Sequence, residues 1–161
     1  MPAGADEVVL PAFLRAARGA YGDAVRAHLA AGGFDELPRN GPYVLGGMAS
    51  RRRTPADLVR ELRVSKQAAS QLIDALVLGG YLDRAVDEDD RRRLAIALTD
   101  RGRAAAEAVR AGVEEVDAEL AARVSADDLH GLMVSLAALA EIGAERAAGR
   151  ERGPGEAGSR A

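Results

Sequence analysis

The chain has 161 residues, a net charge of −3, 48% apolar residues, 29% charged residues and only 3% aromatic residues. This balance is typical of a globular protein of about one domain with an aliphatic, helix-rich core. The sequence contains no cysteine, no apolar run that could span a membrane and no signal-peptide pattern, which excludes disulfides and thiolate metal sites and predicts a cytoplasmic protein.

The N-terminal part is predicted to be helical. An apolar stripe runs over residues 6–31, and Gly32-Gly33 follows it as a stop signal. After a connection over residues 34–41, a short helix is expected over residues 42–48. Its Gly46-Gly47 pair either weakens this helix or permits close packing.

Two further helices are predicted on either side of a tight turn. Thr54-Pro55-Ala56-Asp57 is a strong helix start, because the side chain of Thr54 can accept a backbone hydrogen bond and Pro55 suits the first helical position. The turn falls at Arg63-Val64, and Ser65 is the expected N-cap of the next helix. This second helix should run to Leu78, where Gly79-Gly80 ends it.

A hairpin and two long helices complete the chain. Strands are expected over residues 81–86 and 94–98, joined by a charged tip at residues 87–93. Thr99 should cap a helix over residues 100–124, and Ser125 a helix over residues 126–148. The tail over residues 149–161 has no apolar side chain larger than alanine and is predicted to be disordered. The expected fold is a single domain over 1–161, mainly α with a small β-wing.

The helix that begins at Ser65 has two distinct faces at 3.6 residues per turn. The apolar face consists of Ala69, Leu72, Ile73 and Leu76. The polar face consists of Gln67, Ser70, Gln71 and Asp74. Lysine, glutamine and serine side chains reach phosphate oxygens and base edges, so this face is a candidate for reading the major groove of DNA. The alternative is an ordinary amphipathic helix with a solvated polar face.

The hairpin tip favours the DNA interpretation. It places four acids, residues 87–90, before Arg91, Arg92 and Arg93. An arginine held by a neighbouring carboxylate can enter a narrow minor groove. The segment from Ser50 to Arg103 carries 12 Lys+Arg against 9 Asp+Glu, a balance of +3 in a chain of net charge −3. The alternative is a solvated charged hairpin.

This order of motifs resembles the MarR family of winged-helix regulators. The resemblance is continuous over about fifty residues and rests on the motifs at Leu58–Ser65, Leu72–Arg84, Asp87–Arg92 and Leu98–Gly102. It implies a winged helix-turn-helix over residues 42–99, flanked by dimerisation helices over residues 6–31 and 100–148.

The resemblance also implies roles for individual residues. By the family's pattern Arg92 enters the minor groove, Asp90 braces it and Arg91 contacts phosphate. The chain departs from the family at Gln71, where a basic residue is common, and this bears on which bases are read. The full DNA-binding set expected from the motif and the resemblance is Thr54, Ser65, Lys66, Gln67, Ala68, Ser70, Gln71, Asp90, Arg91 and Arg92.

The expected function is therefore that of a homodimeric, sequence-specific regulator of transcription that binds double-stranded DNA at a pseudo-palindromic operator. We expect such a regulator to be a repressor that releases DNA when a small-molecule effector binds. The alternative is a winged-helix protein-interaction module without DNA binding.

Other kinds of site have weaker support in the sequence. Members of the resembling family bind aromatic or lipophilic ligands, and Phe13, Tyr21 and Tyr43 are the candidates here, although core packing explains them equally well. His28 and His130 lie far apart without a ligand cluster, so no metal site is expected. No catalytic constellation, phosphate loop or cofactor motif is present, so no enzyme and no cofactor are expected.

Overall fold

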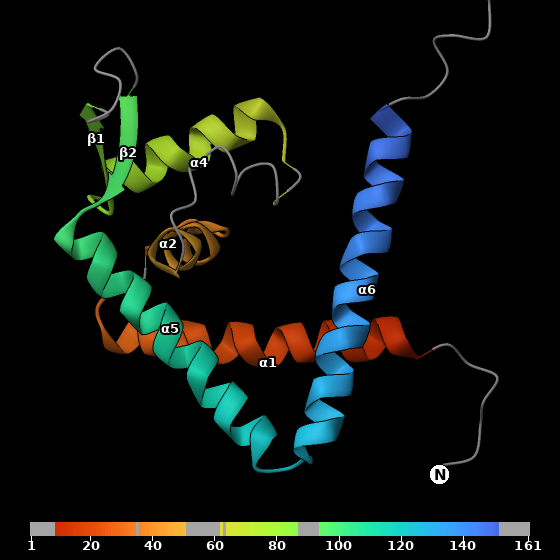
Figure 1. Cartoon of the computed structure of the whole chain (residues 1–161). Coiled ribbons are helices and arrows are strands. Elements are labelled where there is room, and N and C mark those ends of the chain that lie inside the picture. The colour runs from red at the N-terminus through yellow and green to blue at the C-terminus, as the bar shows by residue number, and fades with distance from the viewer. Residues whose placement is uncertain (1–8, 35, 51–61, 63, 87–93, 152–161) are drawn as a thin grey trace, which may run out of the picture. The chain divides into compact units, whose positions relative to one another are not determined.

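The computed structural model describes residues 9–34, 36–50, 62, 64–86 and 94–151 (Figure 1). Over these residues the protein is mainly α-helical, with one small antiparallel sheet, as predicted. The elements in chain order are α1 (Leu10–Ala31), α2 (Gly41–Ser50), α4 (Lys66–Leu78), β1 (Leu82–Val86), β2 (Leu94–Leu98), α5 (Asp100–Ala121) and α6 (Ala126–Glu151).

The chain forms two compact units, Met1–Asp117 and Ala118–Ala161. The first contains α1, α2, α4, the sheet and most of α5. The second contains the end of α5 and the whole of α6. Two expectations stay predictions: the single domain over 1–161 and its dimerisation region over 6–31 and 100–148.

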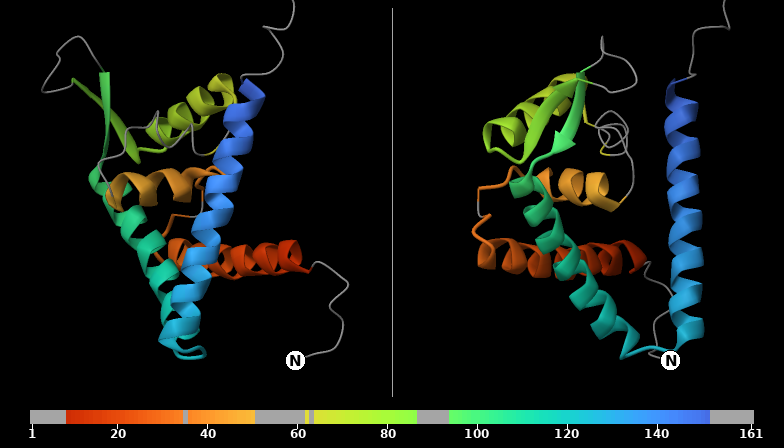
Figure 2. Two further views of the ribbon diagram at one scale, coloured as in Figure 1. Left: turned by 45° about the vertical axis from the view of Figure 1, so that its right-hand side comes forward. Right: turned by 60° about the vertical axis from the view of Figure 1, so that its left-hand side comes forward.

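Within the first unit, α2 lies between α1 and α4 (Figures 1 and 2). Val44 and Leu45 of α2 are completely buried. They belong to a continuous apolar cluster whose other members are Val25, Leu29, Ile73, Leu76, Tyr81, Leu82, Ala105, Ala106 and Val109. Since these residues come from α1, α4, β1 and α5, one core fixes all of these elements to α2.

Close helix contacts depend on small residues. A Cβ atom at Gly112 of α5 would lie 2.7 Å from the Cα atom of Val25 in α1, so the two helices cross almost backbone to backbone. A Cβ atom at Gly46 of α2 would lie 3.1 Å from the Val109 side chain of α5. Of the two interpretations of the Gly46-Gly47 pair, close packing is therefore the one that the structure supports.

The hairpin has the alternation expected of a half-buried sheet. Leu82 pairs with Leu98, and Arg84 pairs with Ile96. Leu82 is only 2% exposed and Leu98 is half-buried, whereas Asp83 and its partner Ala97 are exposed on the opposite face of the sheet. The strand pairing is thus set by where the apolar side chains reach the core.

In the second unit, Ser125 is the cap of α6. Its hydroxyl oxygen accepts a hydrogen bond from the backbone N–H of Asp128 at 3.1 Å and its O–H donates to the Asp128 carboxylate at 2.6 Å. Several large apolar side chains of α6 are exposed in the single chain, namely Leu132, Met133, Val134, Leu139 and Ile142. None of the described helices is long and apolar enough to cross a membrane.

Three helix ends differ from the prediction. α2 is longer than the expected 42–48, because contacts with α5 offset the cost of its glycines. α5 ends at Ala121 rather than near Val124, because the chain must turn before the cap at Ser125. In this turn the N–H of Arg123 donates to the Leu120 carbonyl, a tighter spacing than in an α-helix. α6 continues past 148 to Glu151, and residues 152–161 of the expected tail lie outside the described residues.

Candidate nucleic-acid interface

The start of α4 is set by Ser65, as the sequence predicts. Ser65 has an extended backbone, and its side-chain oxygen accepts a hydrogen bond from the N–H of Ala68 at 3.2 Å. Lys66 is the first helical residue, so Lys66 and Gln67 lie in the first turn, at the positive end of the helix. This turn is suited to anionic groups such as phosphates.

The two faces of α4 are those expected from the sequence. Ala69, Ile73 and Leu76 are buried in the core, and Leu72 is half-buried. Every described residue of the predicted DNA-binding set is exposed: Ser65, Lys66, Gln67, Ala68, Ser70 and Gln71. Because the buried face fixes the rotation of the helix, Gln67, Ser70 and Gln71 share one outward surface opposite the core.

The C-terminal end of α4 is fixed against the hairpin. Gly79 caps the helix, and Gly80 follows with φ of +73°, a conformation that glycine adopts without strain. The N–H of Tyr81 then donates to the Leu76 carbonyl at 2.9 Å. The hydroxyl of Thr99 donates to the Gly80 carbonyl at 2.6 Å, so the start of α5 holds the same turn.

An ion pair between α4 and β1 is a feature that the sequence interpretation missed. Arg84 of β1 donates to the Asp74 carboxylate of α4. Asp74 had been assigned only to the free polar face. The signal available in the sequence was a pair of opposite charges on a helix and on the strand that folds back beside it. Since both side chains are about half exposed, the pair orients the hairpin and the helix more than it stabilises them.

An aromatic and cationic cluster lies at the base of the hairpin. The Arg101 guanidinium lies 4.8 Å from the ring centre of Tyr81 and 5.6 Å from that of Phe34. The two rings meet edge to face at 6.3 Å. This packing joins α5, the α4–β1 turn and the connection after α1.

The predicted DNA-binding set has four further members. Thr54, Asp90, Arg91 and Arg92 lie outside the described residues. Their assigned roles stay predictions. β1 and β2 nevertheless place the two ends of the predicted wing tip beside each other, because Val86 pairs with Leu94.

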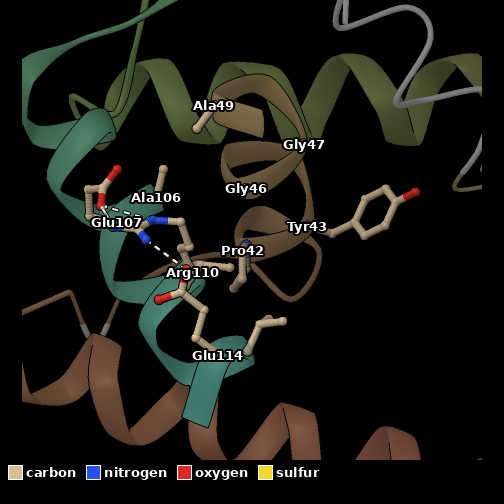
Figure 3. Close-up of a pocket in the computed structure, with 11 residues that line it drawn as sticks. Pro42, Tyr43, Gly46, Gly47, Ala49, Ala106, Glu107, Arg110 and Glu114 are labelled. Atoms are coloured by element: carbon tan, nitrogen blue, oxygen red, sulfur yellow. Dashed lines mark hydrogen bonds and ion pairs between the residues drawn. The ribbon is translucent and has the colours of Figure 1, made fainter. Parts of the chain in front are cut away.

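A cavity of about 600 Å³ lies between α2 and α5 (Figure 3). Its lining from α2 is Pro42, Tyr43, Gly46, Gly47 and Ala49. Its lining from α5 is Ala106, Glu107, Val109, Arg110, Val113 and Glu114. Its size and mainly apolar walls are typical of sites for small organic molecules.

The charged residues of this cavity form one network. Arg110 lies between Glu107 and Glu114 along α5 (Figure 3). Its Nε donates to Glu107 at 3.1 Å, its second terminal nitrogen also donates to Glu107, and its first donates to Glu114 at 2.7 Å. The hydrogen bonds to Glu107 and then to Glu114 raise the pKa of the Arg110 guanidinium above its usual value.

The three aromatic ligand candidates do not come together. Only Tyr43 lines the cavity. Phe13 is 67% exposed on α1. Tyr21 donates a hydrogen bond of 2.6 Å to Asp117 of α5, and this bond, with burial and the Asp117 charge, raises the pKa of Tyr21 to about 12.

Among the described residues there is no group of three or more histidine, cysteine, aspartate or glutamate side chains that could hold a metal ion. His28 instead lies 2.7 Å from the Glu115 carboxylate of α5. His130 is exposed on α6.

Comparison with known families and structures was consistent with the expected resemblance. A family model described as MarR family matches residues 37–93. This confirms the resemblance inferred from the sequence motifs. A search of curated protein sequences gave no match.

Several solved structures share the fold. The S. aureus MepR–DNA complex matches with a TM-score of 0.66 and 20% identity, over 84% of this chain and 98% of that one. An E. coli MarR mutant in complex with operator DNA matches with a TM-score of 0.63 and 21% identity, over 82% and 94% of the two chains. S. aureus MepR bound to ethidium bromide matches with a TM-score of 0.56 and 19% identity, over 82% and 94%. At these identities the likeness establishes the fold.

Proposed function

Because a MarR-family model matches residues 37–93 and solved structures of MarR and MepR share the fold, we propose that the chain is a sequence-specific, DNA-binding regulator of transcription. The observation that carries the proposal is the outward face of α4. That face is polar, capped at its N-terminus and held from behind by a buried apolar face. Such a helix has the form of a major-groove reader.

The exposed side chains in the N-terminal half of α4 divide three tasks in this proposal. Lys66, in the first turn, contacts phosphate and sets the register. Gln67, Ser70 and Gln71 reach base edges, and Gln71 can bond both acceptor and donor of an adenine. Ala68 lets the helix backbone approach the groove closely.

The predicted wing and the first helix of the motif complete the proposed contact. Arg92 enters the minor groove, braced by Asp90, while Arg91 and Thr54 contact the phosphate backbone. The assignments of Arg92, Asp90 and Arg91 derive from the family resemblance. Arginine is favoured in a narrow minor groove because of the groove's strong negative potential.

We further propose a homodimer built from the helical regions at 6–31 and 100–148. Exposed apolar side chains on α1 and on α6 support this proposal. On α1 these are Leu10, Phe13 and Leu14, and on α6 they include Met133 and Val134. Apolar surface of this extent is normally covered by a partner, and two-fold closure is the commonest arrangement. A two-fold dimer would bind a pseudo-palindromic operator.

The proposed regulation is release of DNA on effector binding, as in a repressor. The cavity between α2 and α5 is the candidate effector site, with Tyr43 in its wall. Small-molecule binding is recorded for MepR, whose structure with ethidium bromide shares this fold. α2 contributes both to the cavity wall and to the core that supports α4, so a ligand there could shift the balance between DNA-binding and non-binding forms. The proposal includes no catalytic step and no cofactor.

The test is selection of duplexes from a random library by the purified protein, followed by fluorescence-anisotropy titration of the selected duplex over a salt series. We expect specific binding whose affinity falls steeply with salt, and a loss of about 1–3 kcal/mol in Arg92→Ala. A folded protein that enriches no duplex, and binds DNA with no salt dependence, would refute the regulator and favour a protein-interaction module.

A further inference from the structure

The outward face of α4 carries one carboxylate. Asp74 follows Gln67, Ser70 and Gln71 on this face, at the helical spacing that aligns residues three, four and seven positions apart. It lies one turn beyond Gln71, a rise of about 4.5 Å along the helix axis. A duplex that Gln71 contacts therefore comes close to Asp74 as well.

An unpaired carboxylate at this place opposes DNA binding. Duplex DNA carries about one negative charge per 1.7 Å of its axis, and an acid that faces it is repelled most strongly at low salt. In the sequence of α4, Asp74 is the only acidic residue and Lys66 the only basic one. While Asp74 is ionised, the side chains of α4 therefore offer phosphate no net attraction.

Arg84 of β1 is the partner of this carboxylate. β1 lies beside α4 (Figure 1), and a terminal nitrogen of Arg84 donates to Oδ1 of Asp74. Both side chains are about half exposed, so the ion pair adds little to the stability of the fold. What the pair changes is the charge that the outward face of α4 presents to a ligand.

We propose that Arg84 is a positioning residue for DNA binding, which holds the Asp74 carboxylate in an ion pair and cancels its charge beside the phosphates of the groove. The inference rests on the proposed function, because it assigns a role beside the same DNA-binding face. With the pair intact, Lys66 supplies the net charge of this surface. Arg84 acts through Asp74 and needs no contact of its own with DNA.

Two other roles of the pair predict different results. If the pair only held β1 against α4, loss of either partner would weaken DNA binding equally, because the same contact is broken. If Arg84 contacted phosphate itself, its loss would weaken binding whether or not Asp74 is charged. In the proposed role, loss of Arg84 is harmful only while Asp74 keeps its charge.

The experiment is a double-mutant cycle with amide variants. Arg84→Gln, Asp74→Asn and Asp74→Asn/Arg84→Gln are titrated by fluorescence anisotropy on the duplex that the wild type selects, over a salt series. We expect Arg84→Gln to weaken binding by about fivefold to tenfold at low salt, and less at high salt, because one unpaired charge is left near the phosphates. Asp74→Asn should bind at least as tightly as the wild type. The double variant should recover the wild-type affinity to within about threefold.

Two sets of controls separate this effect from general changes of charge. Glu36 and Arg39 are exposed in the connection between α1 and α2. Glu36→Gln, Arg39→Gln and Glu36→Gln/Arg39→Gln make the same changes in net charge, and their small effects on DNA affinity should be additive. Arg84→Lys keeps the positive charge and should retain the wild-type affinity to within about threefold. Urea unfolding should give similar stability for every variant at positions 74 and 84.

The remaining outcomes overturn the proposal in different ways. If Arg84→Gln weakens binding by the same factor with and without Asp74→Asn, Arg84 contacts phosphate directly. If Arg84→Gln and Asp74→Asn weaken binding equally, the pair is structural. A wild type that binds its selected duplex with a steep salt dependence, and variants that all match it, would refute the role of Arg84 and leave the regulator intact. A wild type that enriches no duplex would refute the regulator, and the role of Arg84 with it.

Discussion

Two exposed side chains of α4, Lys66 and Gln71, should affect DNA binding in different ways. Lys66 lies in the first turn and is assigned to phosphate, whereas Gln71 lies one turn later on the outward face and is assigned to a base. Phosphate contacts contribute affinity that does not depend on sequence, and base contacts contribute discrimination. The two substitutions therefore separate the components of recognition.

We expect Lys66→Ala to weaken binding of all duplexes about equally and to reduce the salt slope by about 1. Gln71→Ala should cost about 1–3 kcal/mol on the selected duplex and much less on duplexes mutated at the contacted base pair. Anisotropy titrations of both variants on a panel of single-base mutant duplexes measure this difference. If Gln71→Ala weakened every duplex equally, the assignment of Gln71 to a base would be wrong.

Tyr21 provides a test of the contact between α1 and α5 that is independent of DNA. Its hydroxyl donates to Asp117, and the pKa of Tyr21 is raised to about 12 from its usual 10.0. Because the pKa of Tyr21 is higher in the folded protein, the hydrogen bond to Asp117 contributes fully to the free energy of unfolding below pH 10. This contribution is lost as the pH rises toward about 12. Tyr21→Phe should lower the free energy of unfolding by about 1 kcal/mol at pH 7.

The corresponding measurement is an ultraviolet titration of tyrosinate together with urea unfolding at neutral pH. The wild type should show one tyrosine that ionises near pH 12, and this component should be missing in Tyr21→Phe. If the wild-type and Tyr21→Phe titration curves had the same shape near pH 12, Tyr21 would not be the tyrosine with the raised pKa. That result would contradict the bond to Asp117.

At the scale of elements, the beginning of α5 is held against the hairpin by an unusually close contact. A Cβ atom at Gly102 would lie only 1.9 Å from the carbonyl oxygen of Tyr81. The N–H of Gly102 also donates to the Thr99 hydroxyl at 3.0 Å, so the capped first turn of α5 cannot easily move away. Alanine at this position would force the helix and the turn before β1 apart.

Gly102→Ala should therefore destabilise the protein by about 1–3 kcal/mol or more, although alanine is the better helix former. Gly149→Ala is the matched control: it lies in α6, outside the proposed dimerisation region, with no contact within 4 Å of the added Cβ, and should stabilise by up to about 1 kcal/mol. Urea unfolding of both variants gives the two values. If both variants changed the free energy of unfolding by the same amount in the same direction, the close contact with Tyr81 would not be the cause of the destabilisation.

The features that the sequence predicted well are those determined by neighbouring residues. The caps at Ser65, Thr99 and Ser125 are all formed, because each needs only a side-chain oxygen and a backbone N–H three residues later. The division of α4 into two faces follows in the same way from helical periodicity. The stop at Gly79-Gly80 requires only the conformational freedom of glycine.

The features that the sequence did not predict depend on residues distant in the chain. The sequence spacing alone places three charged residues on one face of α5: Glu107, Arg110 and Glu114. Nothing in the neighbouring sequence indicates that this face meets the small residues of α2. The pairing of Asp74 with Arg84 depends on how the hairpin folds back beside α4. Tyr43 reached the candidate site whereas Phe13 did not, because tertiary packing decided between them.

At the scale of the whole molecule, the number of chains that bind DNA together determines affinity. A reader that spans two half-sites loses most of its affinity when it separates into single chains, because each chain then contacts one half-site. If α6 provides part of the proposed dimer interface, a charge on its apolar face should affect DNA binding without touching α4.

We therefore expect Met133→Glu/Leu139→Glu to convert a dimer of twice the chain mass of 16.8 kDa into a monomer, measured by sedimentation equilibrium. Both side chains are exposed in the single chain, so the intrachain core should tolerate the change, whereas two buried charges per subunit would oppose association. The loss of the dimer should lower DNA affinity. In the wild type the melting temperature should rise with protein concentration, and in the variant it should be independent of concentration.

The matched control is Leu78→Glu, which replaces another exposed large apolar residue, 91% exposed at the end of α4, with the same charge. It should leave the sedimentation mass at that of the dimer, because one isolated apolar side chain on a surface does not form an interface. A wild-type protein that sediments as a single chain at micromolar concentration would refute the dimer. A Met133→Glu/Leu139→Glu variant that still sediments as a dimer would place the interface on surfaces other than this face of α6, and the apolar side chains of α1 would become the next to change.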